Sequence, residues 1–374
     1  MAARNQTSGL WLQIASWSTA VLAGVVILLT IASAVPSNQW WIRLWDFPRL
    51  IIFTAGLLLL LALFTLRFRG RGPLAIVLFA ALAYQAGHIY PYTIFSPVEA
   101  EQIEIAGTER RAHCFTILSL NVLQDNRDFA RTRALIERVD PDILLLMEAD
   151  QRWLDAVESQ LAGYPYRLEA PLSNTYGMIF ATRLPMTGGR LLNLAEIRTP
   201  SAHAVLRTRS GRPFRLAALH PRPPHPGQDT EERDAEIAIA AMMIRESGLP
   251  ALTLGDFNDV GWSETSQLFR RLGRYIDPRI GRGFYATFPA SLPAFRWPLD
   301  HIFFTEDFGL VSLQTGDPIG SDHLPVRAEI CLVPEVGQTL NAPSETEEDD
   351  AEDVTEVIEA YREDQVVERR TGEE

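Results

Sequence analysis

Six apolar stretches of this chain each meet, at one end, a polar side chain that can bind a cation or exchange a proton. The polar positions are Asn121, Glu148, His220, Asp256 with Asn258, Asp300, and Asp322 with His323. Polar groups are costly inside a core unless they are paired. Carboxylates, amides and imidazoles that several strands deliver at their ends therefore indicate one common site.

Each of these signals is weak when it is taken alone. An aspartate after a glycine, as in Gly255-Asp256, is usually a turn former. A glutamate after four aliphatic residues can be an ordinary strand end. Their order and spacing over about 220 residues of sequence are much more specific.

The segments that would position these side chains alternate between strands and helices, which predicts a layered α/β domain over about residues 113–333. Residues 143–147 are entirely apolar and predict a buried strand, and residues 231–246 predict a helix. The other predicted strands are 115–120, 251–254 and 324–332, and a further helix is predicted over 127–139.

The series resembles the endonuclease/exonuclease/phosphatase superfamily, which includes pancreatic deoxyribonuclease, abasic-site endonucleases, neutral sphingomyelinases and inositol-phosphate phosphatases. The segments that carry the resemblance are Gly255-Asp256-Phe257-Asn258, Ser321 to Val326 and Tyr176 to Pro185. The resemblance covers residues 113–333 and implies a four-layered α/β sandwich, with two mixed β-sheets flanked by helices. It also implies hydrolysis of phosphoester bonds.

The resemblance implies a metal site at Glu148, with Asn121 and Asp322 nearby. Hard oxygen ligands suit Mg²⁺ or Mn²⁺, and the near absence of cysteine argues against a thiolate zinc site.

The resemblance also implies the catalytic roles. Asp256 would hold the attacking water, and Asn258 would donate hydrogen bonds to the phosphoryl oxygens. His323 would contact the phosphate or transfer a proton, with Asp300 fixing its orientation. His220 would protonate the leaving oxygen. The metal and the imidazolium groups would offset the charge that develops in the transition state.

The resemblance and the alternation of side chains along a strand also indicate which residues accompany the histidines of the site. In the deoxyribonuclease branch a glutamate pairs with the histidine that corresponds to His220, and Glu169 falls where that glutamate would. Side chains alternate along a strand, so Asp300 rather than His301 is expected to face the site. His203 and His225 are expected to be structural or surface residues.

The sequence does not distinguish between three classes of substrate. The chain lacks the tryptophan-rich signature of inositol-phosphate phosphatases, and Pro293 to His301 resembles uncharacterised bacterial membrane-linked members. Nucleic acid, a phospholipid head group and a soluble phosphomonoester all remain candidates. The near-neutral predicted domain, with 28 acidic residues and 25 arginines over 108–333, slightly disfavours nucleic acid, although arginines at 207–222 could form a patch. A catalytically silent scaffold is the alternative from another class.

Three apolar runs open the chain, at Leu10–Val35, Leu50–Leu66 and Pro73–Tyr90. Each approaches the roughly 20 residues that a membrane-crossing helix needs. A cleaved signal peptide is a weaker interpretation because two further runs follow the first. Residues 1–92 are therefore expected to be a membrane anchor of three transmembrane helices in a lipid bilayer. Their lack of buried polar groups disfavours a transport role, and only His88 is a candidate intramembrane group.

Arginine placement predicts the orientation of the anchor. Arg67, Arg69 and Arg71 should lie on the cytoplasmic side, so the third helix runs outward. The chain is expected to be a multi-pass protein of the bacterial inner (plasma) membrane with its catalytic domain on the periplasmic or extracellular side. No sequence feature indicates an obligate protein partner.

Two flanking segments complete the predicted organisation. Residues 93–112 are expected to be a linker. Residues 334–374 are expected to be a disordered acidic tail, since 344–374 alone holds 14 acidic residues against 3 arginines. Helical spacing of Val354, Val357, Ile358 and Tyr361 also permits a transient helix.

The two cysteines, Cys114 and Cys331, lie at similar distances from the active-site ends of the first and last strands of the predicted domain. The resemblance implies that these strands are antiparallel neighbours. A disulfide and a pair of buried thiols are both compatible with the sequence.

Overall fold

The computed structural model describes residues 2–341, 343, 346–347 and 349–371. The chain divides into two compact units. One consists of residues 1–91 with the short segment 225–227, and the other of residues 92–224 and 228–374. The division falls close to the expected end of the anchor at residue 92.

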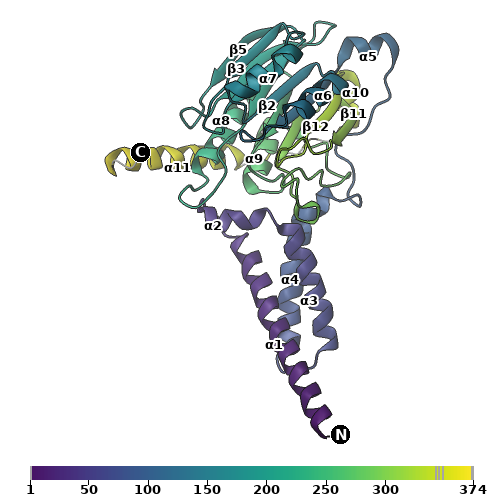
Figure 1. Ribbon diagram of the computed structural model, residues 1–374, viewed down its shortest axis with the longest axis vertical. Helices are drawn as coiled ribbons and strands as arrows, with labels where there is room; N and C mark the ends of the chain where they lie inside the picture. The colour runs from purple at the N-terminus through teal and green to yellow at the C-terminus, as the bar shows by residue number, and fades with distance from the viewer. Residues whose placement is uncertain (1, 342, 344–345, 348, 372–374) are drawn as a thin grey trace. The chain divides into compact units, whose positions relative to one another are not determined.

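The N-terminal part is helical (Figure 1). Many of its large apolar side chains are exposed. Trp11, Phe64 and Ile76 are 70%, 72% and 72% exposed. Two helices, Leu10–Ala32 and Arg71–Tyr92, are long and apolar enough to cross a membrane, and a pair bent by 70° at residues 40–65 could supply a third span. The helices are α1 (Ala2–Ala32), α2 (Trp40–Arg43), η1 (Leu44–Asp46), α3 (Arg49–Thr65), α4 (Arg71–Ile89) and η2 (Tyr90–Tyr92).

A buried polar cluster lies inside this helical unit. Arg49 donates to Asp46 at 2.6 Å, to the Gln85 side chain at 3.1 Å and to the Ser33 carbonyl at 3.2 Å. Gln85 in turn donates to the Thr30 hydroxyl at 3.1 Å. The expectation that these helices lack buried polar groups is therefore wrong. The buried charges of Asp46 and Arg49 pair with each other, and Gln85 of α4, which is itself bonded to Thr30 of α1, accepts a hydrogen bond from Arg49.

The first sheet of the larger unit has six strands in the order β11-β12-β1-β2-β4-β3. β1 runs parallel to β2 and antiparallel to β12, so the sheet is mixed. Its strands are β1 (Cys114–Asn121), β2 (Ile143–Met147), β3 (Tyr166–Ala170), β4 (Met178–Thr182), β11 (Phe308–Thr315) and β12 (Val326–Leu332).

The second sheet also has six strands and is mixed, in the order β5-β6-β7-β8-β10-β9. β7 and β8 are parallel, and β8 and β10 are antiparallel. Its strands are β5 (Met186–Leu192), β6 (Ser201–Arg207), β7 (Pro213–Leu219), β8 (Ala251–Asp256), β9 (Tyr275–Ile276) and β10 (Asp300–Thr305).

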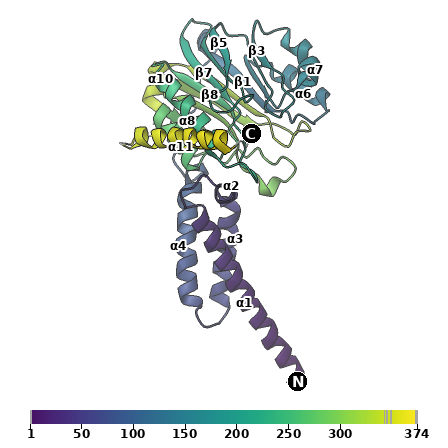
Figure 2. The same cartoon turned by 90° about the vertical axis from the view of Figure 1, so that its left-hand side faces the viewer.

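The two sheets pack face to face, and helices cover their outer faces (Figures 1 and 2). Alternate residues of β1 divide between the layers, with Ile117 in the core between the sheets and Leu118 under α6 (Phe129–Val139) and α7 (Gln151–Leu161). The outer face of the second sheet packs on α8 (Glu231–Arg245) and α9 (Glu264–Gly273). The expected four-layered α/β sandwich of two mixed sheets flanked by helices is confirmed.

Residues 93–112 are not a free linker. Glu99 pairs with Arg270 at 2.6 Å, and Ala100 is fully buried. The Ile103 N–H donates to the Leu310 carbonyl at 2.8 Å, which extends the edge of the first sheet at β11. The chain then forms α5 (Gly107–His113) before β1. The prolines and glutamates of this segment suggested a linker, but its apolar and acidic side chains have partners in the folded domain.

The acidic tail also forms structure where it is described. α10 (Pro334–Leu340) follows β12, and α11 (Asp350–Thr371) packs on α8 and α9 through Val354, Val357 and Ile358. Arg271 anchors the start of α11 by an ion pair with Asp350 at 2.7 Å. The expectation of disorder is therefore wrong for these helices, because a short apolar stripe lies within an acidic composition. Residues 342, 344–345, 348 and 372–374 of the tail fall outside the described residues.

A disulfide joins Cys114 to Cys331. These residues are direct neighbours in the antiparallel register of β1 and β12. Both are buried. Of the two alternatives that the sequence left open, the structure contains the bridge, which ties the first strand of the domain to the last.

Candidate active site

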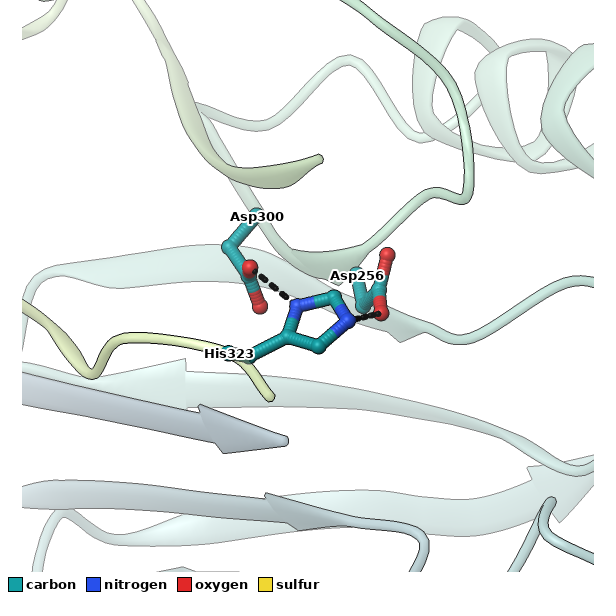
Figure 3. A group of neighbouring side chains, drawn as sticks. All are labelled: Asp256, Asp300 and His323. Atoms are coloured by element: carbon teal, nitrogen blue, oxygen red, sulfur yellow. Dashed lines mark hydrogen bonds and ion pairs between the residues drawn. The ribbon is translucent and has the colours of Figure 1, made fainter. Parts of the chain in front are cut away.

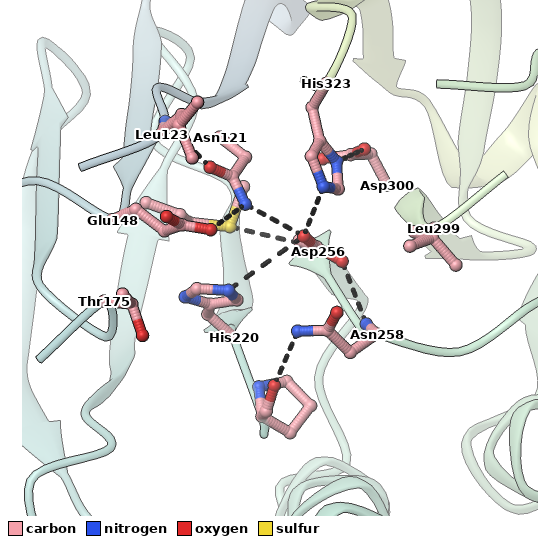
Figure 4. A network of polar contacts seen from close by, with 12 residues as sticks. Asn121, Leu123, Glu148, Thr175, His220, Asp256, Asn258, Leu299, Asp300 and His323 are labelled. Atoms are coloured by element: carbon pink, nitrogen blue, oxygen red, sulfur yellow. Dashed lines mark hydrogen bonds and ion pairs between the residues drawn. The ribbon is translucent and has the colours of Figure 1, made fainter. Parts of the chain in front are cut away.

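The strand pattern gathers the predicted side chains at one end of the space between the sheets (Figure 4). In β1 the odd-numbered residues face the other sheet, so Asn121 does too. In β8 and β10 the even-numbered residues face inward, which places Asp256 and Asp300 opposite β1. His220 follows β7 with the same parity. Six separate segments thus deliver polar groups to one place, as the sequence predicts.

Asp256 lies at the centre of this group. Its Oδ2 accepts a hydrogen bond from Asn121 Nδ2 at 3.0 Å and lies 3.4 Å from His323 Nε2 and 4.0 Å from His220 Nε2. Its Oδ1 accepts from the Asn258 N–H at 2.9 Å. Burial by itself would raise the pKa of Asp256, but the two imidazoles and these hydrogen bonds outweigh it and hold the pKa below its usual value. Asp256 is therefore a carboxylate whose charge the site stabilises.

The backbone around Asp256 is specialised. Gly255 has φ +140°, and a side chain there would meet the Leu219 carbonyl at 1.9 Å, so only glycine fits. Asn258 has φ 47° and Glu148 has φ 57°, both in the left-handed region that non-glycine residues rarely occupy. Such conformations persist where the surroundings over-determine them, and they are frequent at active sites. Here the Asn258 side chain donates to the Pro221 carbonyl at 2.9 Å.

Glu148 and Asn121 meet at the edge of the site. Asn121 Nδ2 donates to Glu148 Oε1 at 2.9 Å, and the backbone N–H of Gln124 donates to Glu148 Oε2 at 3.2 Å. Glu148 is half-buried, so its carboxylate remains accessible. A half-buried carboxylate with neutral donors around it fits a hard divalent cation. Asn121 presents its amide nitrogen to Glu148, and its Oδ1 accepts from the Leu123 N–H at 3.0 Å. Within the part of the chain that the structure describes, the Asp322 carboxylate contacts Ser321 Oγ at 3.4 Å and makes no contact with Asn121 or Glu148.

His323 bridges two buried carboxylates (Figure 3). Its Nδ1 lies 2.8 Å from Asp300 Oδ2, and its Nε2 faces Asp256. Burial by itself would lower the pKa of His323, but Asp256 and Asp300 outweigh it and raise the pKa to about 10. Burial also raises the pKa of Asp300, an effect that His323 opposes. The arrangement therefore holds a buried imidazolium through the physiological pH range.

Ligand atoms of Asp256, Asp300 and His323 lie within 4.8 Å of one another, which is close enough to hold a metal ion. Both ring nitrogens of His323 already face carboxylates, however, and a metal would have to displace one of these contacts. The buried group is therefore fully charge-paired in the structure, whereas Glu148 is half-buried and accepts hydrogen bonds from the neutral Asn121 amide and Gln124 N–H.

His220 lies on the other side of Asp256. It is buried, and its Nδ1 has no hydrogen-bond partner within the described residues. Its ring lies 5.6 Å from that of Tyr176, over which the Arg222 guanidinium is placed at 5.5 Å. The expected pair with Glu169 is not formed. Glu169 lies on the edge strand β3 and approaches Arg167 at 3.6 Å instead, because strand position and not sequence spacing decides which residues can reach His220.

The other histidines separate from the site as expected. His301 points away from the inner face and contacts Arg279 at 2.7 Å, so it is Asp300 that faces His323. His203 is buried in β6 beside Ser201, and its burial lowers its pKa to about 4. His225 contacts the Pro226 carbonyl at 3.1 Å.

Several residues that support the site escaped the sequence analysis. Gln124 holds Glu148 through its N–H and accepts from the Thr175 N–H at 2.9 Å. Arg233 of α8 donates to the Asn258 carbonyl at 3.1 Å. No local pattern marks these residues, since their roles depend on contacts between distant segments. The arginines at 209, 212 and 222 pair with Asp142, Glu335 and Glu196, so the expected patch at 207–222 is largely neutralised.

Comparisons with known proteins place the sequence in a family. A family model described as "Endonuclease/Exonuclease/phosphatase family" matches residues 118–323. No functionally curated protein matches the sequence. Among solved structures, an endonuclease/exonuclease/phosphatase family protein from Bacteroides thetaiotaomicron is 18% identical, with a TM-score of 0.48 over 59% of this chain and 98% of that one.

Two eukaryotic structures are similar to the same extent. D. rerio TDP2 complexed with a single-strand DNA product is 15% identical, with a TM-score of 0.48 over 58% of this chain and 98% of that one. The catalytic domain of human nocturnin, with a bound sulfate anion, is 18% identical, with a TM-score of 0.44 over 58% of this chain and 94% of that one.

Proposed function

Because the chain belongs to the endonuclease/exonuclease/phosphatase family, whose members hydrolyse phosphoester bonds, we propose that it is a membrane-anchored, divalent-metal-dependent phosphodiesterase that acts outside the cytoplasm. The observation that carries the chemistry is the position of Asp256, whose carboxylate is shared by Asn121, His220 and His323 at one end of the sandwich. A carboxylate held in its charged form beside imidazoles is suited to orient a water molecule for attack on phosphorus.

The metal in this proposal is Mg²⁺ or Mn²⁺, held by Glu148 and Asn121 with Asp322 as a further ligand. When bound, the ion neutralises negative charge on the phosphoryl oxygens as that charge develops. The half-buried carboxylate of Glu148, which accepts hydrogen bonds from the neutral Asn121 amide and Gln124 N–H, supports this assignment. An Asn121 ligand requires its amide to rotate so that Oδ1 replaces Nδ2 beside Glu148.

The chain's own residues divide the remaining work. Asp256 orients the attacking water. Asn258 donates one amide N–H to the Pro221 carbonyl, and its second N–H is the one that would donate to the phosphoryl oxygens. The imidazolium of His323, fixed by Asp300, stabilises the developing negative charge, and His220 donates a proton to the leaving oxygen. The unpartnered Nδ1 of His220 leaves that ring without a carboxylate orienter, which Glu169 does not provide.

Two features support the cellular placement. The N-terminal helices are apolar on their exposed faces, and arginines 67, 69 and 71 lie between the second and third runs. The Cys114–Cys331 disulfide is the kind of bond that persists in oxidising compartments. We propose that residues 1–92 anchor the protein in the plasma membrane and that residues 113–333 carry out catalysis on the outer side.

The substrate class is tested by a panel assayed side by side. The full-length chain in detergent would be given plasmid DNA, RNA, sphingomyelin vesicles, phosphatidylinositol vesicles and p-nitrophenyl phosphate, each with Mg²⁺, Mn²⁺ or EDTA. We expect a diester to be preferred over the monoester. Preference for DNA or RNA supports a nuclease, and preference for vesicles supports a phospholipid diesterase. Turnover of the monoester alone would contradict the diesterase proposal.

The placement is tested separately in cells. Protease added to intact spheroplasts should cleave the catalytic domain of the outward-facing protein while a cytoplasmic control protein survives. Protection of the catalytic domain until the cells are lysed would contradict the proposed orientation.

A further inference from the structure

Behind the candidate active site lies a buried cluster of charges that the proposed chemistry does not use. Its centre is Arg279, which is 3% exposed and follows the short strand β9. Arg279 Nε donates to Asp277 Oδ1 at 2.8 Å, and Nη2 donates to Asp277 Oδ2 at 2.7 Å. The two parallel bonds fix the plane of the guanidinium, so its remaining nitrogen positions point in defined directions.

One contact of Arg279 reaches, through His301, the loop that carries Asn258. Arg279 Nη2 lies 2.7 Å from His301 Nδ1, and His301 Nε2 lies 2.9 Å from the Asp259 carbonyl. A guanidinium can only donate, so Nδ1 of His301 must accept and the ring proton must sit on Nε2, where it is donated to Asp259. Burial and the neighbouring Arg279 lower the pKa of His301 to about 3, in keeping with a neutral ring. The contact therefore holds the backbone carbonyl of Asp259, the residue after Asn258.

Arg279 also shares a small cavity with Asp300, the carboxylate that orients His323. Arg279 Nη1 and Asp300 Oδ1 are both buried and make no direct hydrogen bond within distance and angle limits in the described part of the chain, although the nearby Thr287 side chain favours the charged form of Asp300. Both residues line a cavity of about 10 Å³, together with Tyr285 and the apolar residues Ile302, Leu313 and Val326. A space of this size accommodates about one water molecule, and its lining includes a hydrogen-bond donor, Arg279, and an acceptor, Asp300, as the partners that such a water needs.

We propose that Arg279 is a positioning residue for hydrolysis, which fixes the Asn258 loop through His301 and the Asp300 carboxylate through one buried water. This inference rests on the proposed function for its effect on rate, but its structural contacts stand independently. Arg279 thereby connects two elements of the site, the loop after β8 and the start of β10, that would otherwise be free to shift separately.

The segment before the catalytic sandwich holds Arg279 in turn. The Asp277 N–H donates to Glu99 Oε2 at 3.0 Å, and Glu99 also pairs with Arg270. The ring of Tyr92 lies 5.6 Å below the Arg279 guanidinium. Residues 92–99 therefore belong to the support of the active site, and a catalytic fragment that starts at residue 100 would lack them.

The test measures kcat and KM of the full-length chain with bis-p-nitrophenyl phosphate and Mg²⁺. Arg279→Met removes both the contact with His301 and the proposed water-mediated contact with Asp300. His301→Gln retains a donor where Nε2 lies, and His301→Phe removes it. The matched control is Val157→Ala, a fully buried truncation in α7 under the outer face of the first sheet.

We expect Arg279→Met and His301→Phe to lower kcat about 10- to 100-fold with KM nearly unchanged, because a small misplacement of reacting groups has effects of that size. His301→Gln should restore most of the rate, and Val157→Ala should leave kcat unchanged. Wild-type kcat in His301→Phe, or equal losses in His301→Gln and His301→Phe, would overturn the role of His301. This comparison remains decisive if Arg279→Met does not fold.

Two measurements separate this inference from the proposed function. Hydrogen exchange of residues 257–262 should rise in His301→Phe relative to wild type even if neither protein hydrolyses the diester. Unchanged exchange would overturn the loop contact. A high-resolution crystal structure should show a water between Arg279 Nη1 and Asp300 Oδ1. A cavity that is empty or filled by an apolar side chain would overturn the water-mediated contact with Asp300. A wild-type protein without activity would count against the proposed function alone.

Discussion

The side-chain amide of Asn121 donates a hydrogen bond to Asp256 Oδ2 at 3.0 Å, across 135 residues of sequence and from one sheet to the other. The same amide nitrogen donates to Glu148 Oε1 at 2.9 Å. In the metal-free protein Asn121 therefore lies between Glu148, the main proposed metal ligand, and Asp256, the proposed water-orienting carboxylate, and it reduces the repulsion between the two. This relationship makes the charge balance of the site testable without any substrate.

Asn121→Asp should destabilise the metal-free protein. The substitution replaces two donated hydrogen bonds with a third carboxylate, and leaving buried charge without a partner costs about 3–5 kcal/mol. Urea unfolding in EDTA should show the loss, and Mg²⁺ should recover part of it. Asn193→Asp, at an exposed position, is the control. Equal stability of the two variants in EDTA would contradict the charge arrangement.

Asp300→Asn should lower kcat about 100-fold or more, because it removes the charge that holds the His323 imidazolium. The measurement is hydrolysis of bis-p-nitrophenyl phosphate by the full-length chain with Mg²⁺. Asp317→Asn, which neutralises an exposed aspartate in the loop before His323, is the matched control. A rate for Asp300→Asn within threefold of the control would rule out a dependence on this pair.

Removal of the disulfide should lower stability but spare activity. The double variant Cys114→Ala with Cys331→Ala opens a bridge that spans 217 residues, and such bridges contribute about 2–5 kcal/mol to the free energy of unfolding. Urea unfolding of wild type with and without reductant should reproduce the difference. At 25 °C the folded variant should retain its kcat. Equal stability with and without reductant would show that the bridge does not form in the protein.

Glu236→Gln should make the protein more stable at high pH. Burial in α8, with Glu196 nearby, raises the pKa of Glu236 to about 8, while Arg222 opposes the shift. The folded state therefore binds more protons than the unfolded state between about pH 4.5 and pH 8, so stability falls as pH rises through this window.

The difference between variant and wild type isolates this group from others that titrate. It should be near zero at pH 4.5 and should grow to at most about 5 kcal/mol in favour of Glu236→Gln above pH 8. Urea unfolding at pH 5 and pH 9 measures it. A difference that does not change between these two pH values would exclude a raised pKa for Glu236.

Much of the sandwich is predictable from local patterns. The entirely apolar run 143–147 is β2 at the same bounds, and the predicted helix 231–246 is α8 to within one residue. The motifs around Asp256 and His323 mark the centre of the site because they combine strand ends with chemistry-bearing residues. Alternation along β10 also assigns Asp300 and His301 to opposite faces, as the contacts of the two residues confirm.

The remainder depends on contacts that no local pattern contains. Glu169 has the right sequence position to pair with His220, but its strand lies at the edge of the sheet. The segment before β1 looks like a linker, although Glu99 is bound by Arg270, 171 residues away. The acidic tail looks disordered, although α11 has an apolar face that fits α8 and α9. Each of these differences is a tertiary interaction that overrides composition.

The central claim is that Glu148 and Asp256 serve one metal-dependent hydrolytic site. The most direct measurement is hydrolysis of bis-p-nitrophenyl phosphate by the full-length chain in detergent, with Mg²⁺ titrated against wild type, Glu148→Gln and Asp256→Asn. We predict activity that EDTA abolishes, a large increase in the Mg²⁺ concentration that Glu148→Gln requires, and loss of kcat in Asp256→Asn at every Mg²⁺ concentration. Wild-type activity that survives EDTA, or an unaltered Mg²⁺ requirement in Glu148→Gln, would contradict the account.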